Sequence, residues 1–418
     1  MPQAFQEWKD LKAAYRFFDQ KGVSFEPVIA PHLQATRQNC REPGEYLLIE
    51  DTTLLDFSHH PASEDLALIG NGEGRGFELH STFAVRIEAW SLEQRPEGTV
   101  VGLFHQQCHS PRPTPKNESR QARLSRPRKS QKWAESIRIV GGPPPGCRWI
   151  YVADRESDFY EPIALLQQER VDFVIRAYQD RRLAGEESCH LRQKVAQAPL
   201  LGRTTVEVRS RGGEPARTAI VEVRSVRVDL DGPWRPGGWQ PPLKDIGVVE
   251  VREVDAPEGV KEPLHWILLT SLPCATWAQA QRVVGYYGAR WWIEEYHKAL
   301  KSGAGVENSQ LRRGYRLEPL IAVLAVVAVR LLSTKMLARS RPESHEAAAS
   351  FGPEMIELLE KRLGKPKGGW TNRNVLVATA RLGGFPARKS DGMPGWITIW
   401  RGWQRLMWMC EGADLIQE

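Results

Sequence analysis

The chain contains few cysteines, and their arrangement matches neither a zinc site nor a disulfide framework. Six cysteines are spread over 418 residues, and no two of them form a C-x-x-C pair. The N-terminal segment also lacks the apolar run of a signal peptide. Such a sequence is typical of a protein that folds in a reducing cytosol, so we expect neither structural zinc nor disulfides.

Long apolar runs are scarce as well. The stretch that most resembles a membrane span, residues 317–332, contains Glu318, Pro319 and Arg330. Its charge-free part is too short to cross a bilayer, because a spanning helix needs about 20 apolar residues. We therefore expect a buried helix at this position and no membrane partner.

Charge of one sign does not dominate the whole chain, but basic residues gather in one segment. Lysine and arginine number 57 against 51 acidic residues, which gives a net charge of +6. Residues 111–132 contain eight basic residues and one acid, Glu118. Prolines and serines between them predict a flexible loop. This loop is either a solvated insertion or a segment that contacts phosphates.

Two hydrophobic strands end in acidic residues. Residues 46–53 predict a short buried strand that carries Asp51 at its end, and residues 148–154 predict a second strand that ends in Asp154. A helix and another strand follow the second one, which is the spacing of a βαβ unit. The helix is expected at 159–168 and the strand at 171–176, and alternating patterns predict further strands at 77–90 and 99–105.

The pattern changes after residue 183. Four strand patterns separated by turns, at 204–210, 219–230, 248–254 and 264–271, predict a β-rich insertion. Helical patterns return beyond residue 332, at 354–363, 374–382 and 396–409, and a short amphipathic helix is expected at 6–19. The chain therefore passes from an α/β region through a β-rich region to a helical one.

Between the β-rich and helical regions, residues 287–301 predict an amphipathic helix with a charged stripe. Thr276 and Gln279 supply a capping box at its start. The stripe follows the spacing Y-x2-R-x3-E-x6-K and consists of Tyr287, Arg290, Glu294 and Lys301. At about 100° per residue these four side chains share an arc of about 60°. A charged stripe alone is most often a solvated face, so its meaning depends on the two strand-end acids.

Asp51, Asp154 and Glu294 have the chemistry of a divalent metal site. They offer only oxygen ligands, which favours Mg²⁺ or Mn²⁺ over zinc. Two such ions about 4 Å apart activate an attacking oxygen and stabilise the leaving oxygen of a phosphodiester. Each aspartate also has a simpler explanation, since an acid at a strand end often caps the following turn. Competing carboxylates nearby are Asp56, Asp158, Glu156 and Glu295.

With these residues in place, the chain resembles the DDE transposases, and more narrowly the transposon-5-like branch of the insertion-sequence-4 family. The likeness rests on Asp51-Thr-Thr, on Asp154-Arg-Glu and on the Y-x2-R-x3-E-x6-K signature. Shorter segments extend it over nearly the whole chain, at 14–17, 101–105, 266–271, 301–305 and 380–385. The resemblance implies an α/β fold, in which a ribonuclease-H-like mixed sheet with flanking helices is interrupted by the β-rich insertion and followed by a C-terminal helical region.

The resemblance also implies a division of the chain into domains. Residues 1–40 would be the remnant of an N-terminal DNA-binding helical domain, and residues 341–418 a helical dimerisation region. The catalytic core would comprise residues 41–183 and 272–340, with the Glu-bearing helix in its second part. The β-rich insertion, residues 184–271, would separate the two parts.

The activity implied is cut-and-paste DNA transposition in the bacterial cytosol, at the nucleoid. Water nicks the transposon end, the freed 3′-hydroxyl attacks the opposite strand to form a hairpin, and the reopened end is joined to target DNA. The partners implied are double-stranded DNA, as transposon ends and as target, and a second copy of the chain in a homodimer on DNA.

The same resemblance assigns roles to single residues. Two Mg²⁺ ions, replaceable by Mn²⁺, would be held by the catalytic residues Asp51, Asp154 and Glu294. The residues implied to bind DNA phosphates are Tyr287, Arg290, Lys301 and Arg176. Trp266 would stack on a flipped base, and a core tryptophan of the β-rich insertion is the alternative.

The sequence leaves two other functions open. Most of the N-terminal domain with which family members recognise transposon ends has no counterpart, and only its last part, residues 2–39, matches. The chain is then expected to be either an active enzyme or a truncated, non-catalytic inhibitor subunit that dimerises with full-length transposase. A ribonuclease-H-like nuclease without a joining step is the second alternative.

Overall fold

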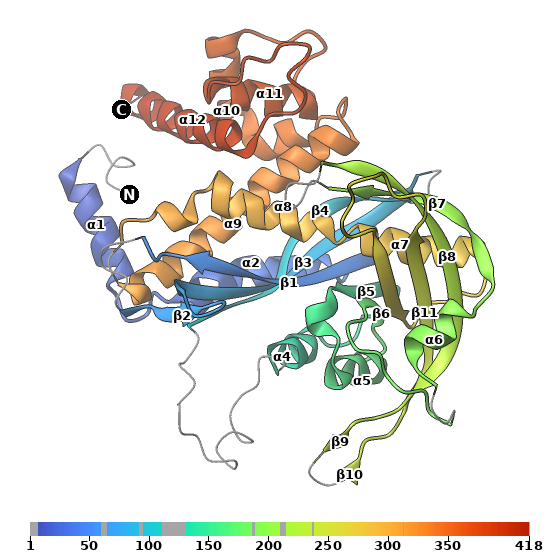
Figure 1. Ribbon diagram of the computed structural model, residues 1–418. Helices are drawn as coiled ribbons and strands as arrows, with labels where there is room; N and C mark the ends of the chain where they lie inside the picture. The colour runs from blue at the N-terminus through green and yellow to red at the C-terminus, as the bar shows by residue number, and fades with distance from the viewer. Residues whose placement is uncertain are drawn as a thin grey trace.

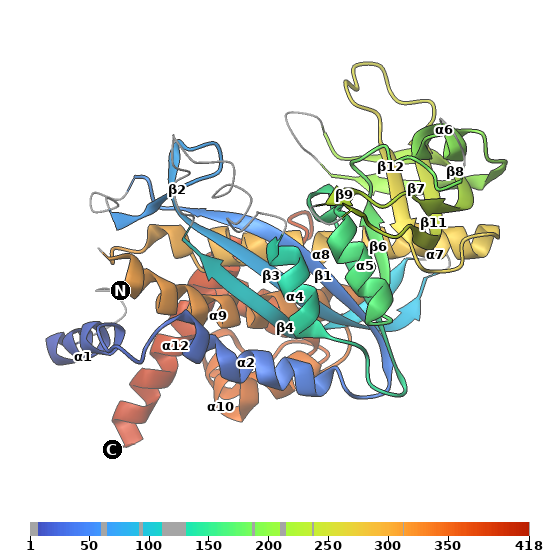
Figure 2. The ribbon, with the colours of Figure 1, turned by 90° about the horizontal axis from the view of Figure 1, so that it is seen from below.

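The computed structural model describes residues 7–59, 65–91, 95–110, 131–185, 189–209, 215–235, 238–311 and 313–417. A large sheet crosses the middle of the molecule with helices on both faces, and the C-terminal helices form a layer of their own (Figures 1 and 2). The mixed α/β architecture that the sequence predicts is therefore confirmed. The predicted basic loop lies outside the described residues, apart from residues 131 and 132.

Within the described residues, ten strands form one mixed sheet. Its order is β2-β3-β1-β5-β6-β12-β11-β8-β7, and β4 pairs with β3 off this path. The strands β1, β5 and β6 are parallel, whereas the other neighbours are antiparallel. The strands of the sheet are β1 (Gly44–Asp56), β2 (Ala67–Ile69), β3 (Gly74–Trp90), β4 (Pro96–His109), β5 (Cys147–Ala153), β6 (Asp172–Arg176), β7 (Leu200–Val208), β8 (Arg217–Leu230), β11 (Leu243–Glu253) and β12 (His265–Thr270). A small hairpin of β9 (Trp234–Arg235) and β10 (Gly238–Trp239) projects from the body (Figure 1).

The predicted βαβ unit and β-rich insertion are both present, and they belong to the same sheet. The helix α5 (Tyr160–Gln168) connects the parallel strands β5 and β6. Strand β12 then pairs antiparallel with β6, with Leu268 opposite Arg176. The long strands of the insertion thus continue the central sheet.

Helices cover both faces of the sheet because its central strands are apolar on both sides. On one face, helices α2, α7, α8 and α9 pack over Leu47 and Ile49 of β1. On the opposite face, α4, α5 and α6 enclose a second core that includes Tyr46 and Leu48 of the same strand. Alternate residues of β1 therefore enter two different cores. The helices besides α5 are α1 (Trp8–Phe18), α2 (Phe25–Asn39), α4 (Gln131–Val140), α6 (Leu191–Ala196), α7 (Trp277–Gly288), α8 (Trp291–Lys298), α9 (Gly314–Ser340), α10 (Glu346–Leu363), α11 (Asn372–Leu382) and α12 (Trp396–Gln417).

The helix α9 lies between the sheet and the C-terminal helices (Figure 1). In the described part of the chain it is the one helix whose length and apolar composition would suffice to cross a membrane. Its residues Ile321, Ala325 and Leu332 are fully buried in the core of the protein. The buried helix predicted at residues 317–332 is thus confirmed and extends further at both ends.

The C-terminal helices α10, α11 and α12 enclose a small core around Phe351, Val375 and Leu406. The helices α11 and α12 cross at very short range, since a Cβ atom on Gly402 would lie 1.7 Å from the carbonyl oxygen of Thr379. Only glycine permits such an approach of two backbones. The three helices predicted here are confirmed, each with wider boundaries than expected.

Candidate active site

Asp51 and Asp154 stand at the same level on neighbouring parallel strands. The pairing of β1 with β5 ends at Glu50 opposite Ala153, so the next residue along each chain segment is one of the two aspartates. Each aspartate comes two residues after a core residue of its strand, Ile49 or Val152, and side chains two apart on a strand point to the same face. Both aspartates therefore point to the face that α8 covers. The sheet thus brings the two acids together on the face that α8 covers.

The strand that carries Asp51 does not end at this residue, so that prediction is wrong. The antiparallel neighbour β3 keeps pairing with β1 as far as Asp56 opposite Gly76, and Asp51 lies within the ladder opposite Ser81. Asp154, by contrast, follows the last residue of β5, as predicted. Its Oδ1 accepts a hydrogen bond of 2.8 Å from the backbone N–H of Glu156 and caps a short 3₁₀ turn.

The competing carboxylates near the two aspartates lie in other surroundings. Asp56 and Glu156 are exposed. Asp158 is buried, and it forms an ion pair with Arg181. Asp51 and Asp154 are therefore the acids of this region that share the covered face of the sheet.

The helix predicted over residues 287–301 is broken, so the single regular helix is wrong. The capping box of Thr276 and Gln279 starts α7 as predicted, but α7 ends at Gly288 and α8 begins at Trp291. Hydrogen bonds between residues three apart tighten the backbone around Arg290. A π-helical turn, Ala299–Gly303, then widens it after α8. The regular stripe is preserved only in part.

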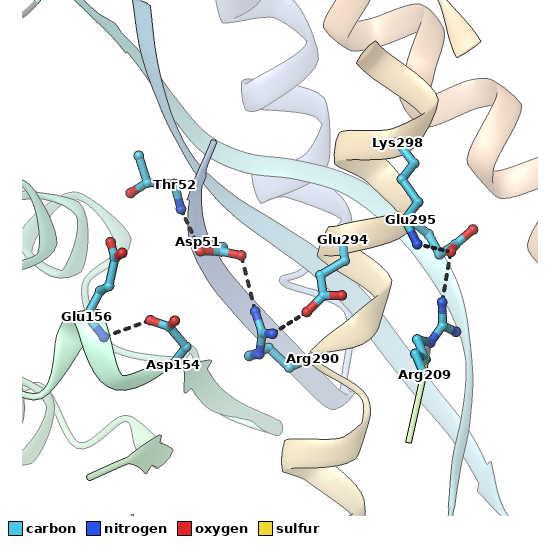
Figure 3. A network of polar contacts seen from close by, with 9 residues as sticks. All are labelled: Asp51, Thr52, Asp154, Glu156, Arg209, Arg290, Glu294, Glu295 and Lys298. Carbon is cyan, nitrogen blue, oxygen red and sulfur yellow. Dashed lines mark hydrogen bonds and ion pairs between the residues drawn. The ribbon is translucent and has the colours of Figure 1, made fainter. Parts of the chain in front are cut away.

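Arg290 joins the acids of the strand and of the helix (Figure 3). Its Nη1 donates a hydrogen bond to Asp51 Oδ2 at 3.1 Å, and its Nη2 donates to Glu294 Oε1. Figure 3 shows Asp154 on the other side of Asp51 from Glu294, close to the same guanidinium. Burial acts to lower the pKa of Arg290, but Tyr287 and the three acids outweigh it and raise that pKa.

The positive charge of Arg290 does not fully compensate the three carboxylates of the site. The pKa of Asp51 is raised from 3.8 to about 7, mainly by burial, and the neighbouring carboxylates of Asp154 and Glu294 act in the same direction. The Arg290 guanidinium and the N–H of Thr52 oppose this shift without cancelling it. A carboxylate with a raised pKa is one for which an additional cation would be stabilising.

The donor set fits a divalent cation in chemistry. Three carboxylates from β1, the end of β5 and α8 present oxygen ligands, which Mg²⁺ and Mn²⁺ prefer. Among the described residues, no group of three acids, histidines or cysteines is already in position to hold a metal. At this site the guanidinium of Arg290 binds Asp51 and Glu294 at the same time. A metal bound here would take over contacts that Arg290 now makes.

An aromatic and basic group borders the acids. Tyr287 is buried, and the ring of Trp266 packs edge-on against it with 4.8 Å between centroids. Burial raises the pKa of Tyr287, while Arg290 and Arg176 act in the opposite direction. Arg176 also donates from Nη2 to the carbonyl of His265 at 3.1 Å. These predicted DNA-binding residues therefore lie together beside the acids.

Lys301 lies apart from this group. Its Nζ donates to the carbonyl oxygen of Leu54 at 2.9 Å and forms an ion pair of 3.1 Å with Glu307. It thus lies within the π-helical turn, next to the last residues of β1. None of these contacts involves the three acids.

Sequence reasoning missed a basic cluster around the next residue of α8. Glu295 accepts a hydrogen bond of 2.9 Å from Arg209 and approaches Lys298 at 3.4 Å (Figure 3). It also approaches Lys335 at 3.6 Å. Arg209 also lies over the ring of Trp291 at 4.3 Å. Only Lys298 has a helical spacing from Glu295 that the sequence reveals; the other contacts come from distant segments.

Comparison with known proteins finds similarity to transposases. Residues 146–329 match the family model described as a transposase DDE domain, and residues 1–23 match a model described as transposase DNA-binding. The first match includes Asp154 and Glu294 and begins after Asp51. Among solved structures, the chain is similar to a piggyBac transposase synaptic complex with hairpin DNA, at 12% identity and a TM-score of 0.36. That similarity covers 86% of this chain and 60% of the transposase chain.

Transposases with such a domain use divalent metal ions, which agrees with the oxygen ligands found here. The chain therefore carries, over residues 146–329, a transposase DDE domain, which is an enzyme domain of the DNA nuclease and strand-transferase class.

Proposed function

We propose that the chain is a cut-and-paste DNA transposase that works by two-metal phosphodiester chemistry on a ribonuclease-H-like core. The observation that carries the proposal is the arrangement of Asp51, Asp154 and Glu294 around Arg290. Two of the acids come from adjacent parallel strands, and the third comes from the helix above them. The family match over residues 146–329 supports the same chemistry independently.

In this proposal Asp51, Asp154 and Glu294 hold two Mg²⁺ ions, or Mn²⁺ in their place. When bound, the ions supply an activated attacking oxygen and stabilise the leaving oxygen. Arg290 keeps the Asp51 and Glu294 carboxylates together before the ions bind and then turns to a DNA phosphate. The planar fork of donors in arginine suits both partners.

The DNA strand follows the aromatic and basic group beside the acids. Tyr287 and Arg176 bind phosphates next to the cut, and Lys301 binds one further along β1. Trp266 stacks on a base that leaves the duplex as the 3′-hydroxyl forms the hairpin. The support for this arrangement is the contact of Trp266 with Tyr287, which places an aromatic surface next to the acids.

Two further assignments concern the ends of the chain. Residues 1–40 act as part of a DNA-binding domain, which is supported by the transposase DNA-binding match at residues 1–23. Residues 341–418 pair two copies of the chain on DNA. Support for the second assignment comes from α12, where Ile397 and Trp408 are 54% and 44% exposed.

The test is a cleavage reaction with the full chain, Mg²⁺ and linear DNA that carries the inverted repeats flanking its gene. A denaturing gel should show a nick, then a hairpin-ended product, and target DNA should yield a joined product. Nicks without hairpins or joined DNA would support a nuclease instead. If the chain cuts nothing but inhibits a longer form of itself, the inhibitor function would replace this proposal.

A further inference from the structure

A buried polar group lies directly behind Asp51, on the opposite face of the sheet. Glu50 and His80 are both 0% exposed, and His80 Nε2 contacts Glu50 Oε1 at hydrogen-bonding range. His80 Nδ1 lies 2.8 Å from the hydroxyl oxygen of Thr52. Glu50 and Thr52 are the residues on either side of Asp51 in β1, so their side chains point to the face of the sheet opposite to Asp51.

The surroundings hold His80 in one orientation. It lies on β3 opposite Thr52 in the strand register. The ring of Trp133, from α4, packs edge-on against it with 4.6 Å between centroids. Its Nε2 contacts the Glu50 carboxylate and its Nδ1 contacts the Thr52 hydroxyl, so both ring nitrogens have a polar partner.

Such a group is costly to bury. A carboxylate and an imidazole without access to water lose hydration that one mutual contact only partly replaces. Apolar residues at positions 50 and 80 would fill the same core at lower cost, as Leu48 does on the same face. The polar group therefore needs a role other than packing.

The group connects to Asp51 through Thr52. The backbone N–H of Thr52 donates to Asp51 Oδ1 at 2.8 Å, while Asp51 Oδ2 receives the hydrogen bond from Arg290. Fixing the side chain of Thr52 also fixes the direction of its backbone N–H within β1. Asp51 is thereby held with Oδ1 engaged and Oδ2 presented to the site.

We propose that Glu50, His80 and Thr52 form a positioning relay that orients Asp51 as a metal ligand. The proposal rests on the proposed function, because it takes Asp51 to bind a divalent ion. His80 anchors the Thr52 hydroxyl, Glu50 anchors His80, and the Thr52 N–H keeps the Asp51 carboxylate from rotating. Groups behind a ligand commonly set metal affinity in this way.

The test compares two threonine substitutions that each remove one hydroxyl from this face of the sheet. Thr52→Val breaks the contact with His80, whereas Thr82→Val breaks a similar contact of 2.9 Å with Ser136 on the same face. Mn²⁺ is titrated into the full chain without DNA, free Mn²⁺ is followed by electron paramagnetic resonance, and the melting temperature is recorded for each variant.

We expect Thr52→Val to weaken Mn²⁺ binding by about 10- to 100-fold. Thr52→Ser, which keeps the hydroxyl, should bind like wild type, and Thr82→Val should lower the melting temperature about as much as Thr52→Val without losing affinity. Wild-type affinity in Thr52→Val, or an equal loss in Thr82→Val, would overturn the relay.

Asp51→Asn separates this result from a failure of the metal site itself. If Asp51→Asn loses Mn²⁺ while Thr52→Val does not, the relay is wrong and the proposed function stands. If wild type and Asp51→Asn bind Mn²⁺ alike, Asp51 is not a ligand, and the relay and the proposed two-metal function fail together.

Discussion

The guanidinium of Arg290 donates to Asp51 Oδ2 at 3.1 Å and to Glu294 on its own helix, so one cation ties the sheet to the helix above it. The side chain of Asp51 is 16% exposed and that of Glu294 is 38% exposed. Both acids therefore depend on Arg290 for compensation, and they supply the oxygen ligands of the proposed metal site. Substitution of Arg290 or of either acid should therefore change stability and metal binding in a direction that these contacts determine.

Replacing Arg290 by glutamine should destabilise the metal-free protein and increase the effect of Mg²⁺. Without the guanidinium, the half-buried carboxylates of Asp51 and Glu294 lose the cation that compensates both of them. Thermal unfolding with and without Mg²⁺ measures this effect. We expect a lower melting temperature without metal and a larger Mg²⁺-dependent rise than in wild type. An identical rise in both proteins would show that Mg²⁺ and Arg290 do not share these acids.

Stability should fall with rising pH through the range in which Asp51 ionises. Its pKa is about 7 in the folded chain against 3.8 ordinarily, with burial as the main cause. The folded state then binds this proton more tightly than the unfolded state, so the contribution is complete below about pH 4 and is lost by about pH 7. The full shift corresponds to up to about 4 kcal/mol.

Urea unfolding at pH 5 and pH 8, without divalent metal, measures this slope. Asp51→Asn should be less sensitive to pH than wild type over the same interval, because asparagine does not ionise. Asp56→Asn is the matched control, since Asp56 lies on the same strand but is exposed. Equal pH slopes in wild type and Asp51→Asn would contradict the electrostatic description of the site.

Glu294→Gln should abolish nicking in Mg²⁺ and leave DNA affinity nearly unchanged. Loss of one ligand of the proposed metal pair removes several kcal/mol of transition-state stabilisation, or about 10³-fold in rate. Glu156→Gln provides the control, because the Glu156 side chain is exposed and only its backbone contacts Asp154. Cleavage rates and gel-shift affinities are compared on the same DNA. Retained nicking in Glu294→Gln would remove this residue from the site.

Trp266→Ala should impair hairpin formation more than the first nick. Stacking of a base on an aromatic ring contributes about 1–3 kcal/mol, and the first nick does not require an extruded base. Trp266→Phe keeps a ring next to Tyr287 and should retain most hairpin formation. The ratio of nicked to hairpin product over time is the readout. Equal losses of both steps would leave Trp266 with a packing role only.

Much of this site follows from local sequence. The apolar runs before Asp51 and Asp154 predict neighbouring buried strands, and their parallel pairing is what brings the acids to one level. The capping residues Thr276 and Gln279 mark the start of α7 correctly. Local rules suffice here because each signal lies within one element.

The remaining features depend on contacts between distant segments. Pairing with β3 extends β1 as far as Asp56. The helix breaks between α7 and α8 at Arg290, although neither glycine nor proline occupies that position. The helix α2 escaped prediction because Pro27 and Pro31 interrupt its sequence, although the helix forms around them. The hydrogen bond from Arg290 to Asp51 joins residues that are 239 positions apart, so no helical or strand periodicity in the sequence predicts it.

The central claim is that Asp51, Asp154 and Glu294 ligate divalent metal during DNA cleavage. The most direct test replaces Asp154 by cysteine and compares nicking in Mg²⁺ with nicking in Mn²⁺, because a thiolate is a poor ligand for Mg²⁺ and a better one for the softer Mn²⁺. We expect Asp154→Cys to be inactive in Mg²⁺ and to recover nicking in Mn²⁺, whereas Asp154→Ala stays inactive in both. Unchanged nicking in Mg²⁺, or equal recovery of the alanine variant in Mn²⁺, would contradict a metal-ligand role for Asp154.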